Sequence, residues 1–249
     1  MFTTKGFAAT STRQIAEMVG IRQASLYHHF PNKEEILAAL LEETVSPALA
    51  AADRISDAPE PATVRLHALA TFDVTQLTTT KWNLGALYLL PELLTDRFEP
   101  FRTQRTLLRG HYRQLADLAL AEIADGSGNA SPALADLPFR IVESAIATRA
   151  DIERGLLPGR ENEGAAGLLA DTCLRALGWT KPMDDIRSKS RTLLAETATG
   201  TPVTSSRARR SREIKSAERF SLGVILSDVF VVTDGIRNYG ATAAQALNC

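Results

Sequence analysis

A helix-turn-helix pattern within residues 11–30 constrains the fold more than any other feature of the sequence. Ser11 precedes an apolar series at helical spacing, and Gln14 stands where a capping box would satisfy two backbone N–H groups at the helix start. Gly20 follows the series, which is typical of a helix end because glycine adopts a left-handed backbone at little cost. A second short helix is expected to follow and to stop before Pro31. The sequence therefore predicts two helices joined by a short turn.

Small and apolar side chains would let these two helices pack against each other. Ala16 is expected where they approach most closely, and Ile21 and Leu26 are expected to hold the second helix against the first. Asn32 then caps a third helix, which carries an apolar stripe. We expect Pro47 to end or kink this third helix, because proline lacks the backbone N–H that a helix interior requires.

The second helix leaves hydrogen-bonding and stacking side chains exposed, as a recognition helix in the DNA major groove does. These positions are Gln23, Ala24, Ser25, Tyr27, His28 and, at the end of the helix, His29. Arg13 and Lys33 bracket this face, and Arg22 is expected either to contact a phosphate or to be solvated. Residues 1–33 carry four basic residues and one acidic residue, although the whole chain has a net charge of -1. A basic head on an acidic remainder is a charge asymmetry that the function of the chain has to explain.

Several sequence blocks occur together in one order and spacing. They are Lys-Gly-Phe at 5–7, Ile-Ala at 15–16, Val-Gly-Ile at 19–21, Leu-Tyr-His-His-Phe at 26–30 and Asn-Lys-Glu-Glu at 32–35. Together they resemble the DNA-binding head of the tetracycline-repressor (TetR) family. The resemblance implies phosphate contacts from Thr12, Tyr27, His29 and Lys33. It implies base-edge contacts from Arg13, Gln23, Ser25 and His28. The family usually has a Ser or Thr cap where this chain has Arg22, so we expect the second helix to lack a side-chain cap.

The resemblance also implies a function for the whole chain. It implies a homodimeric transcriptional regulator, most often a repressor, that binds a palindromic double-stranded operator and is released by a small-molecule ligand. We expect the dimer to form through residues 138–178, and we expect Glu at Gly167 or Ala170 to give monomers. The alternative is a helical dimerising protein with only nonspecific DNA binding and no ligand response.

Helical periodicity continues from residue 61 to residue 179, without the alternation of a strand. We therefore expect an all-α fold with a helix-turn-helix domain at 1–46, a helical ligand-binding and dimerisation domain at 47–179, and a low-complexity tail at 180–249. A polar composition predicts disorder over 180–216. Six side chains are candidates for a ligand pocket, and an ordinary core or half-buried position is an equally good interpretation of each. They are His67, Trp82, Tyr88, Phe101, His111 and Tyr112.

No constellation of residues predicts an enzyme. The sequence lacks a nucleophile elbow, a His-Glu-x-x-His pair and a phosphate-binding loop. Two cysteines exclude a disulfide scaffold and a cysteine zinc cluster, and we expect no cofactor. Cys173 lies in an apolar helical run and is interpreted as a buried small hydrophobe. The sequence begins without the apolar run of a signal peptide, so we expect a cytoplasmic protein.

The start of the sequence carries one more expectation. Heads of this family have a further helix before Lys-Gly-Phe, and only four residues precede that block here. Without this helix, Ile15, Ile36, Leu37 and Leu40 would have few apolar partners upstream. We therefore expect the natural protein to carry about 10–20 further N-terminal residues that form this helix.

Overall fold

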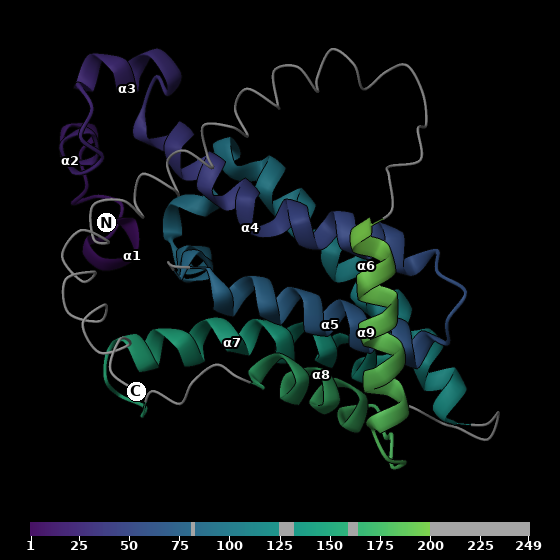
Figure 1. Ribbon diagram of the computed structural model, residues 1–249. Coiled ribbons are helices and arrows are strands. Elements are labelled where there is room, and N and C mark those ends of the chain that lie inside the picture. The colour runs from purple at the N-terminus through teal and green to yellow at the C-terminus, as the bar shows by residue number, and fades with distance from the viewer. Residues whose placement is uncertain (81–82, 125–131, 159–163, 200–249) are drawn as a thin grey trace, which may run out of the picture. The chain divides into compact units, whose positions relative to one another are not determined.

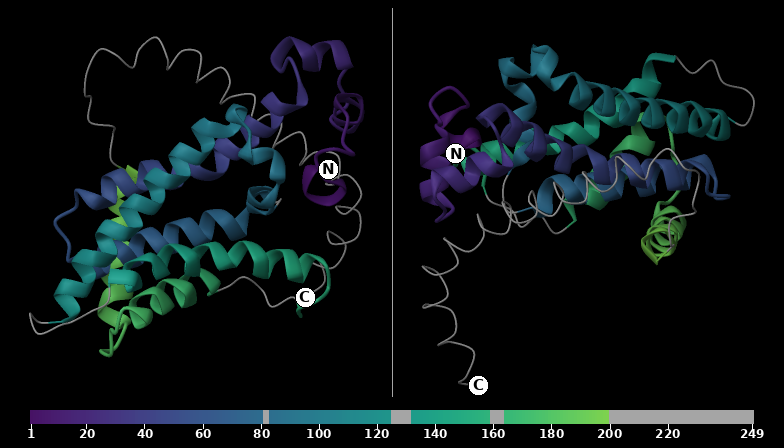
Figure 2. Two further views of the ribbon diagram at one scale, coloured as in Figure 1. Left: turned by 180° about the vertical axis from the view of Figure 1, so that it is seen from behind. Right: turned by 90° about the horizontal axis from the view of Figure 1, so that it is seen from above.

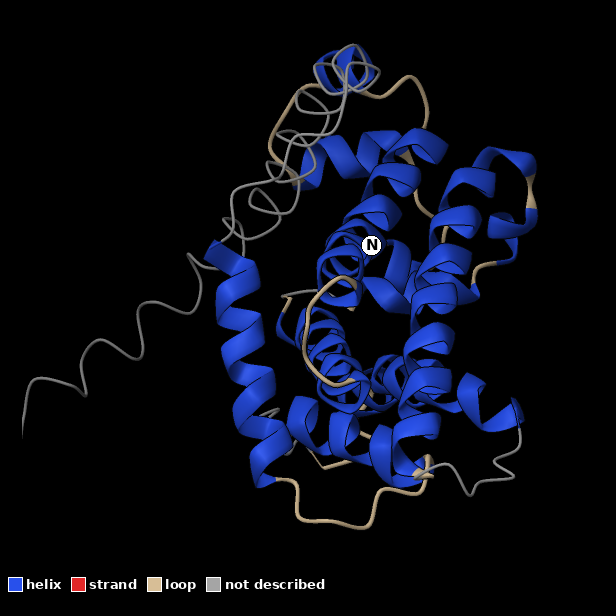
Figure 3. Cartoon of the chain, turned by 90° about the vertical axis from the view of Figure 1, so that its right-hand side faces the viewer, coloured by secondary structure: helices blue, strands red, loops and turns tan. Residues whose placement is uncertain are grey.

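The computed structural model describes residues 1–80, 83–124, 132–158 and 164–199, and these residues form helices and loops without a strand (Figure 1 and Figure 3). The expected all-α fold is confirmed. The α-helices are α1 (Phe2–Lys5), α2 (Thr12–Met18), α3 (Gln23–His29), α4 (Lys33–Ser56), α5 (Ala62–Thr79), α6 (Glu99–Ile123), α7 (Leu137–Glu153), α8 (Ala165–Ala176) and α9 (Asp184–Thr199). Short 3-10 helices are η1 (Leu84–Leu89), η2 (Pro91–Leu94), η3 (Asp96–Phe98) and η4 (Pro132–Asp136). Among the described helices, none combines the length and apolar character that crossing a membrane requires.

The chain divides into two compact units, and helix α4 contains residues of both. The described part of the first unit is Met1–Glu43, here called the head, and the second unit is Thr44–Pro202, here called the body. Helix α4 continues through Pro47, so the proline does not end it. Val45 and Ala48, on either side of the proline, are buried. Their packing compensates for the helical hydrogen bond that proline cannot donate.

The head has an apolar core of its own. Ala16 and Leu26 are buried, as expected of the contact between α2 and α3. Ile36 and Leu37 of α4 are buried as well, so the described head covers these two side chains. Ile21 was expected to be a further contact, but it is 40% exposed. Its backbone N–H donates to the Ala16 carbonyl at 3.0 Å, so the backbone and not the side chain closes the turn.

Helix α5 is the central element of the body. It packs against α6, α7, α8 and α9, and α7 and α8 lie side by side along it (Figure 1 and Figure 2). Leu66, Leu69 and Val74 on this helix are fully buried. A helix that is covered on several sides needs apolar residues around most of its circumference, which is the composition that α5 has.

Helix α9 corrects the prediction of disorder after Trp179. Residues Asp184–Thr199 are helical, and Ile186, Ser190 and Leu193 on this helix are buried. These residues recur at helical spacing and form a narrow face that the polar composition concealed. The prediction is therefore wrong for α9, and residues 200–249 of the expected tail lie outside the described residues.

The start of α5 is capped from α6. Pro61 precedes the helix and offers no side-chain acceptor, but Glu122 accepts hydrogen bonds from the backbone N–H groups of Ala62 (2.6 Å) and Thr63 (3.0 Å). A carboxylate satisfies unpaired N–H groups there and interacts favourably with the positive end of the helix dipole.

We expect Glu122→Ala to lower the free energy of unfolding by about 0.5–2 kcal/mol, which is the range for the loss of a helix cap. Urea unfolding followed by circular dichroism measures the change. Asp117→Ala removes an exposed carboxylate from the same helix, and we expect it to change stability by less than about 0.5 kcal/mol. Equal losses in the two variants would contradict the capping role.

Candidate nucleic-acid interface

The turn between α2 and α3 has the geometry that the sequence predicts. The Ser11 hydroxyl accepts from the Gln14 N–H at 3.3 Å, and the Gln14 side chain accepts from the Ser11 N–H at 3.0 Å, which completes the capping box. Gly20 has a φ of +72°, a left-handed conformation that disfavours other residues. The backbone therefore fixes how α3 leaves the turn.

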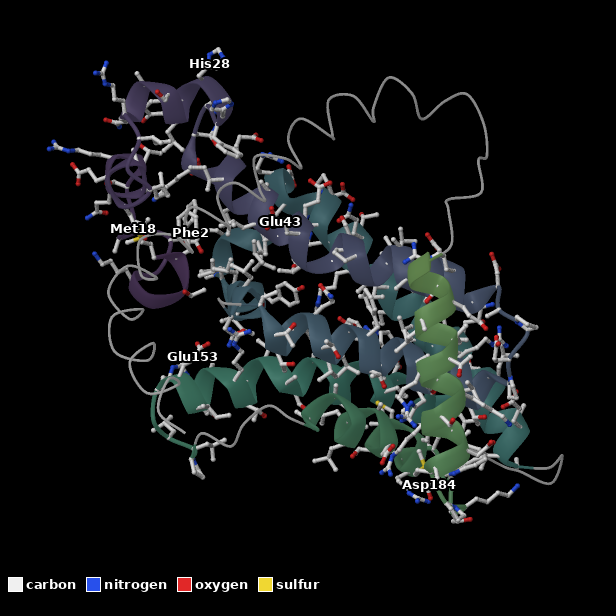
Figure 4. The ribbon with its side chains drawn as sticks, viewed as in Figure 1. Phe2, Met18, His28, Glu43, Glu153 and Asp184 are labelled. Atoms are coloured by element: carbon white, nitrogen blue, oxygen red, sulfur yellow. The ribbon has the colours of Figure 1, made fainter. Side chains whose placement is uncertain are left out.

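Helix α3 presents a polar, exposed face. Leu26 points into the head core, and the remaining predicted positions of the helix are exposed: Gln23, Ala24, Ser25, Tyr27, His28 and His29. Figure 4 shows the His28 side chain projecting outward from α3. Arg22 precedes the helix in an extended conformation and supplies no side-chain cap, as expected. This face has the hydrogen-bonding groups that base edges require, and no apolar side chain other than Ala24 and the Tyr27 ring.

A hydrogen-bond network joins the start of α2 to α3. The Gln23 amide donates to the Thr12 hydroxyl at 3.2 Å, and the Thr12 and Tyr27 hydroxyls lie 2.9 Å apart. The network holds the Gln23 side chain in place and leaves its carbonyl oxygen and one N–H available. Those two groups form the pair that glutamine uses to recognise adenine.

Lys33 has partners within the head. Its ammonium donates to the carbonyls of Phe7 (2.9 Å) and Thr10 (3.2 Å), and it lies 4.3 Å from the centre of the Phe7 ring. The lysine thereby orders the segment that leads into α2. An ammonium has three N–H donors, so one donor remains for a phosphate.

A hollow of about 400 Å³ lies next to Lys33 on the head. Residues 8–12 and 31–34 line it together with Tyr27. Three of the four residues with an implied phosphate contact, Thr12, Tyr27 and Lys33, therefore meet at one concave surface, and His29 does not line it.

Arg13 lies on the exposed surface of α2. Its guanidinium donates to the Glu17 carboxylate at 2.8 Å, and both side chains are largely exposed. Solvent screens an exposed ion pair of this kind and leaves it weak, so Arg13 can exchange Glu17 for a DNA group at little cost.

The five candidate pocket residues that the structure describes do not all meet at one place. Tyr88 and Phe101 are neighbours, with ring centres 5.1 Å apart. The Tyr112 hydroxyl donates to the buried Asp73 carboxylate at 3.0 Å. His67 lies elsewhere on α5 and contacts α8 and α9, whereas His111 lies 3.2 Å from Asp53 and 3.0 Å from Ser56 of α4. Trp82 lies outside the described residues.

Two polar features of the body were missed by the sequence analysis. Asp73 is buried in α5, and its burial, with Glu143 nearby, raises its pKa to about 7 against the opposing hydrogen bond from Tyr112. Arg105 donates two hydrogen bonds to Glu143, at 2.8 and 2.7 Å, and its guanidinium lies 5.6 Å from the Tyr88 ring centre. An acidic residue within the apolar run of α5 was the available signal for Asp73.

Cys173 is fully buried, as expected of a small hydrophobic residue. Burial raises the pKa of its thiol to about 12, so the thiol stays protonated and unreactive at neutral pH.

The head is similar in sequence to known bacterial regulatory proteins. Residues 1–40 match the family model "Bacterial regulatory proteins, tetR family". The HTH-type transcriptional repressor KstR2 of Mycobacterium tuberculosis is 51% identical over 41 residues, which are 16% of this chain and 20% of that protein. KstR2 of Mycolicibacterium smegmatis is 44% identical over 43 residues, which are 17% of this chain and 21% of that protein. The matched region thus spans about a fifth of the length of these curated relatives.

A solved structure extends the similarity to the body. The crystal structure of Mycobacterium smegmatis AmtR superposes with a TM-score of 0.70 at 45% sequence identity, over 78% of this chain and 88% of that chain. This similarity to AmtR therefore covers both the head and the helical body.

Proposed function

The chain belongs to the tetR family of bacterial regulatory proteins, and we propose that it is a DNA-binding transcriptional repressor that binds a palindromic operator as a homodimer and is released by a small-molecule ligand. The observation that carries the DNA-binding role is the arrangement of the head. Thr12, Tyr27 and Lys33 line one hollow beside the exposed polar face of α3. Phosphate-binding groups beside base-reading groups are what a helix-turn-helix protein requires. Such a role is carried out in the cytoplasm.

The division of labour in the head follows from the side chains. We infer that Thr12, Tyr27, His29, Lys33 and Arg22 contact phosphates, and that Arg13, Gln23, Ser25 and His28 contact base edges, with Ala24 against them. Phosphate contacts position the protein without reading sequence, whereas base contacts specify the site. The exposure of all of these residues except the half-buried Thr12 and Lys33 supports this assignment.

Dimerisation is assigned to α7 and α8. Leu168 on α8 is 67% exposed, and Ser144, Ala147 and Thr148 form an exposed stripe of small residues on α7. An exposed leucine on α8 and exposed small residues on α7 suit the close packing of two helices from each subunit around a twofold axis. The two heads of such a dimer would contact half-sites about 34–36 Å apart, one turn of the DNA helix.

Release by a ligand requires two states of the dimer. A ligand bound in the body stabilises a spacing of the heads that does not fit the half-sites, and DNA must then weaken ligand binding by the same factor. The body supplies polar groups for such a site, among them the buried Asp73 with Tyr112 and the half-buried Arg105–Glu143 pair.

Selection of DNA sites by the purified protein tests the proposal, and two variants test the assigned contacts. We expect Gln23→Ala to change the base preference at one position of each half-site. We expect Lys33→Ala to weaken binding to all sites alike. We also expect it to reduce the salt slope, the steepness with which log affinity falls with log salt concentration, by about 1 per half-site. Fluorescence anisotropy with selected and scrambled DNA at several salt concentrations measures both effects.

Two controls accompany these variants. Lys33 also orders the segment before α2, so a thermal melt must show that the head of Lys33→Ala remains folded. Lys189→Ala removes an exposed lysine from α9 and should leave the salt slope unchanged. Selection that enriches no sequence would favour the alternative, a helical dimerising protein with nonspecific DNA binding. Altered base preference in Lys33→Ala would contradict the placement of α3 in the groove.

A further inference from the structure

The body has a hollow of about 450 Å³ where α9 meets α5 and α8. Its volume lies within the range of about 300–1,000 Å³ that small-molecule sites occupy. His67 and Thr71 of α5 and Arg187, Ser190 and Arg191 of α9 are among its lining residues. Figure 4 labels Asp184, which also lines it, at the start of α9.

One side of the hollow is a fixed polar network. His67 lies 3.0 Å from the Ser190 hydroxyl through Nδ1 and 3.0 Å from the Asp171 carboxylate through Nε2. Arg187 donates two hydrogen bonds to Asp171, so the charges of this pair compensate each other. Burial lowers the pKa of His67, against the hydrogen bond that its Nε2–H donates to the Asp171 carboxylate, so the imidazole is neutral at neutral pH. This side of the hollow is ordered and carries little net charge.

Arg191 is the cation that this network does not neutralise. Its one hydrogen bond in the described part of the chain runs from Nε to the Arg187 carbonyl at 3.4 Å, and it has no ion pair there. Asp184 forms no ion pair with Arg191 among the described residues; its carboxylate is 90% exposed and lies 3.7 Å from Arg187. The Arg191 guanidinium thus keeps its outer N–H donors for a bound acceptor.

The hydroxyl groups beside it present acceptors. Thr71 donates to the His67 carbonyl at 2.8 Å. The Ser190 hydroxyl lies 3.0 Å from His67 Nδ1 and 3.2 Å from the Val64 carbonyl, and its one hydrogen goes to one of these acceptors. Oxygen lone pairs of both hydroxyls are therefore left for a ligand. Open space adjoins Gly167 of α8, where a Cβ atom would meet nothing within 4 Å. The hollow therefore pairs a cationic donor with neutral acceptors.

We propose that this hollow binds a small oxyanion, a carboxylate or phosphate that also carries a hydroxyl or amine, with Arg191 as its anchor. The oxyanion accepts from the Arg191 guanidinium, and the ligand's own O–H or N–H donates to Thr71 or Ser190. A ligand so bound joins α9 to α5 and α8, and α8 is the helix assigned to the dimer. The inference rests on the proposed function only in that the bound anion would be the effector.

Isothermal titration of the full chain with citrate and, separately, with inorganic phosphate at constant ionic strength tests the site. We expect saturable binding with one site per protomer. Arg191→Gln should weaken it at least about tenfold, the loss expected for hydrogen bonds from a charged donor. Arg191→Lys should weaken it less because the charge remains. The tighter-binding probe identifies the ligand as carboxylate or phosphate.

Arg113→Gln, which makes the same charge change at an exposed position of α6, is the matched control and should bind as the unmodified chain does. Failure of both probes to bind, or equal binding by Arg191→Gln, would overturn the proposal. Operator binding is measured separately. Arg191-dependent anion binding supports the site even in a protein that selects no operator, and that second result would count against the repressor role alone.

Discussion

Replacing Ala170 with Glu is expected to unfold the body, whereas Leu168→Glu on the same helix is expected to leave each protomer folded and to abolish the dimer. Ala170 is fully buried, and Leu168 is 67% exposed. Burying a carboxylate without a partner costs several kcal/mol, a large part of the about 5–15 kcal/mol that stabilise a domain. A charge on the exposed side of α8 instead meets only the surface that a partner subunit would cover.

Circular dichroism and light scattering separate the two results. The sequence alone placed both Gly167 and Ala170 at the interface, and the structure corrects this for Ala170, which faces the protomer's own core. Gly167 is on an open side of α8, but it lines the hollow next to α9, so Leu168 gives the cleaner test. A folded, monomeric Ala170→Glu protein would contradict the burial argument, and dimeric Leu168→Glu would move the interface away from this face.

The stability of the body is expected to fall as pH rises from about 4 to 7, because of Asp73. Burial raises the pKa of Asp73 from 3.8 in the unfolded chain to about 7 in the folded protein, with Glu143 of α7 adding to the effect and the Tyr112 hydroxyl of α6 opposing it. The folded state therefore holds a proton that the unfolded state has released. Across this interval the loss amounts to at most about 4 kcal/mol, at 1.36 kcal/mol for each pH unit.

Asp73→Asn removes this titration, and we expect the difference between the two proteins to change with pH in the stated direction. Urea unfolding at half-unit steps from pH 4.5 to 8 measures it, and the contributions of other groups cancel in the difference. Tyr112→Phe removes the hydrogen bond that favours the charged form, so its stability loss should extend to higher pH. A pH-independent difference between the unmodified chain and Asp73→Asn would contradict the assignment.

The head could be predicted closely because its determinants are local. The capping box of Ser11 and Gln14, the cap at Asn32 and the turn at Gly20 depend on residues a few positions apart. The exposed face of α3 follows from the same periodicity. The sequence could not reveal that Lys33 reaches back to Phe7, because that contact joins residues 26 positions apart.

The body was predicted less completely because its polar contacts are distant in sequence. Helical periodicity predicted the class of fold, but Ser190 meets His67 from 123 residues away. Helix α9 was missed for this reason, because its few apolar residues can be recognised as buried only when their packing against α5 is known. The candidate pocket residues were chosen by type, and type does not show which of them converge.

The ammonium of Lys33 also bears on the entropy of DNA binding. A free lysine side chain loses up to about 2 kcal/mol of rotamer freedom when it is fixed. Here the carbonyls of Phe7 and Thr10 and the Phe7 ring already restrict it before DNA is met. Most of that entropy is therefore already lost when the head folds. A phosphate contact made by the remaining donor then costs little further side-chain entropy, so more of its favourable enthalpy contributes to the affinity for DNA.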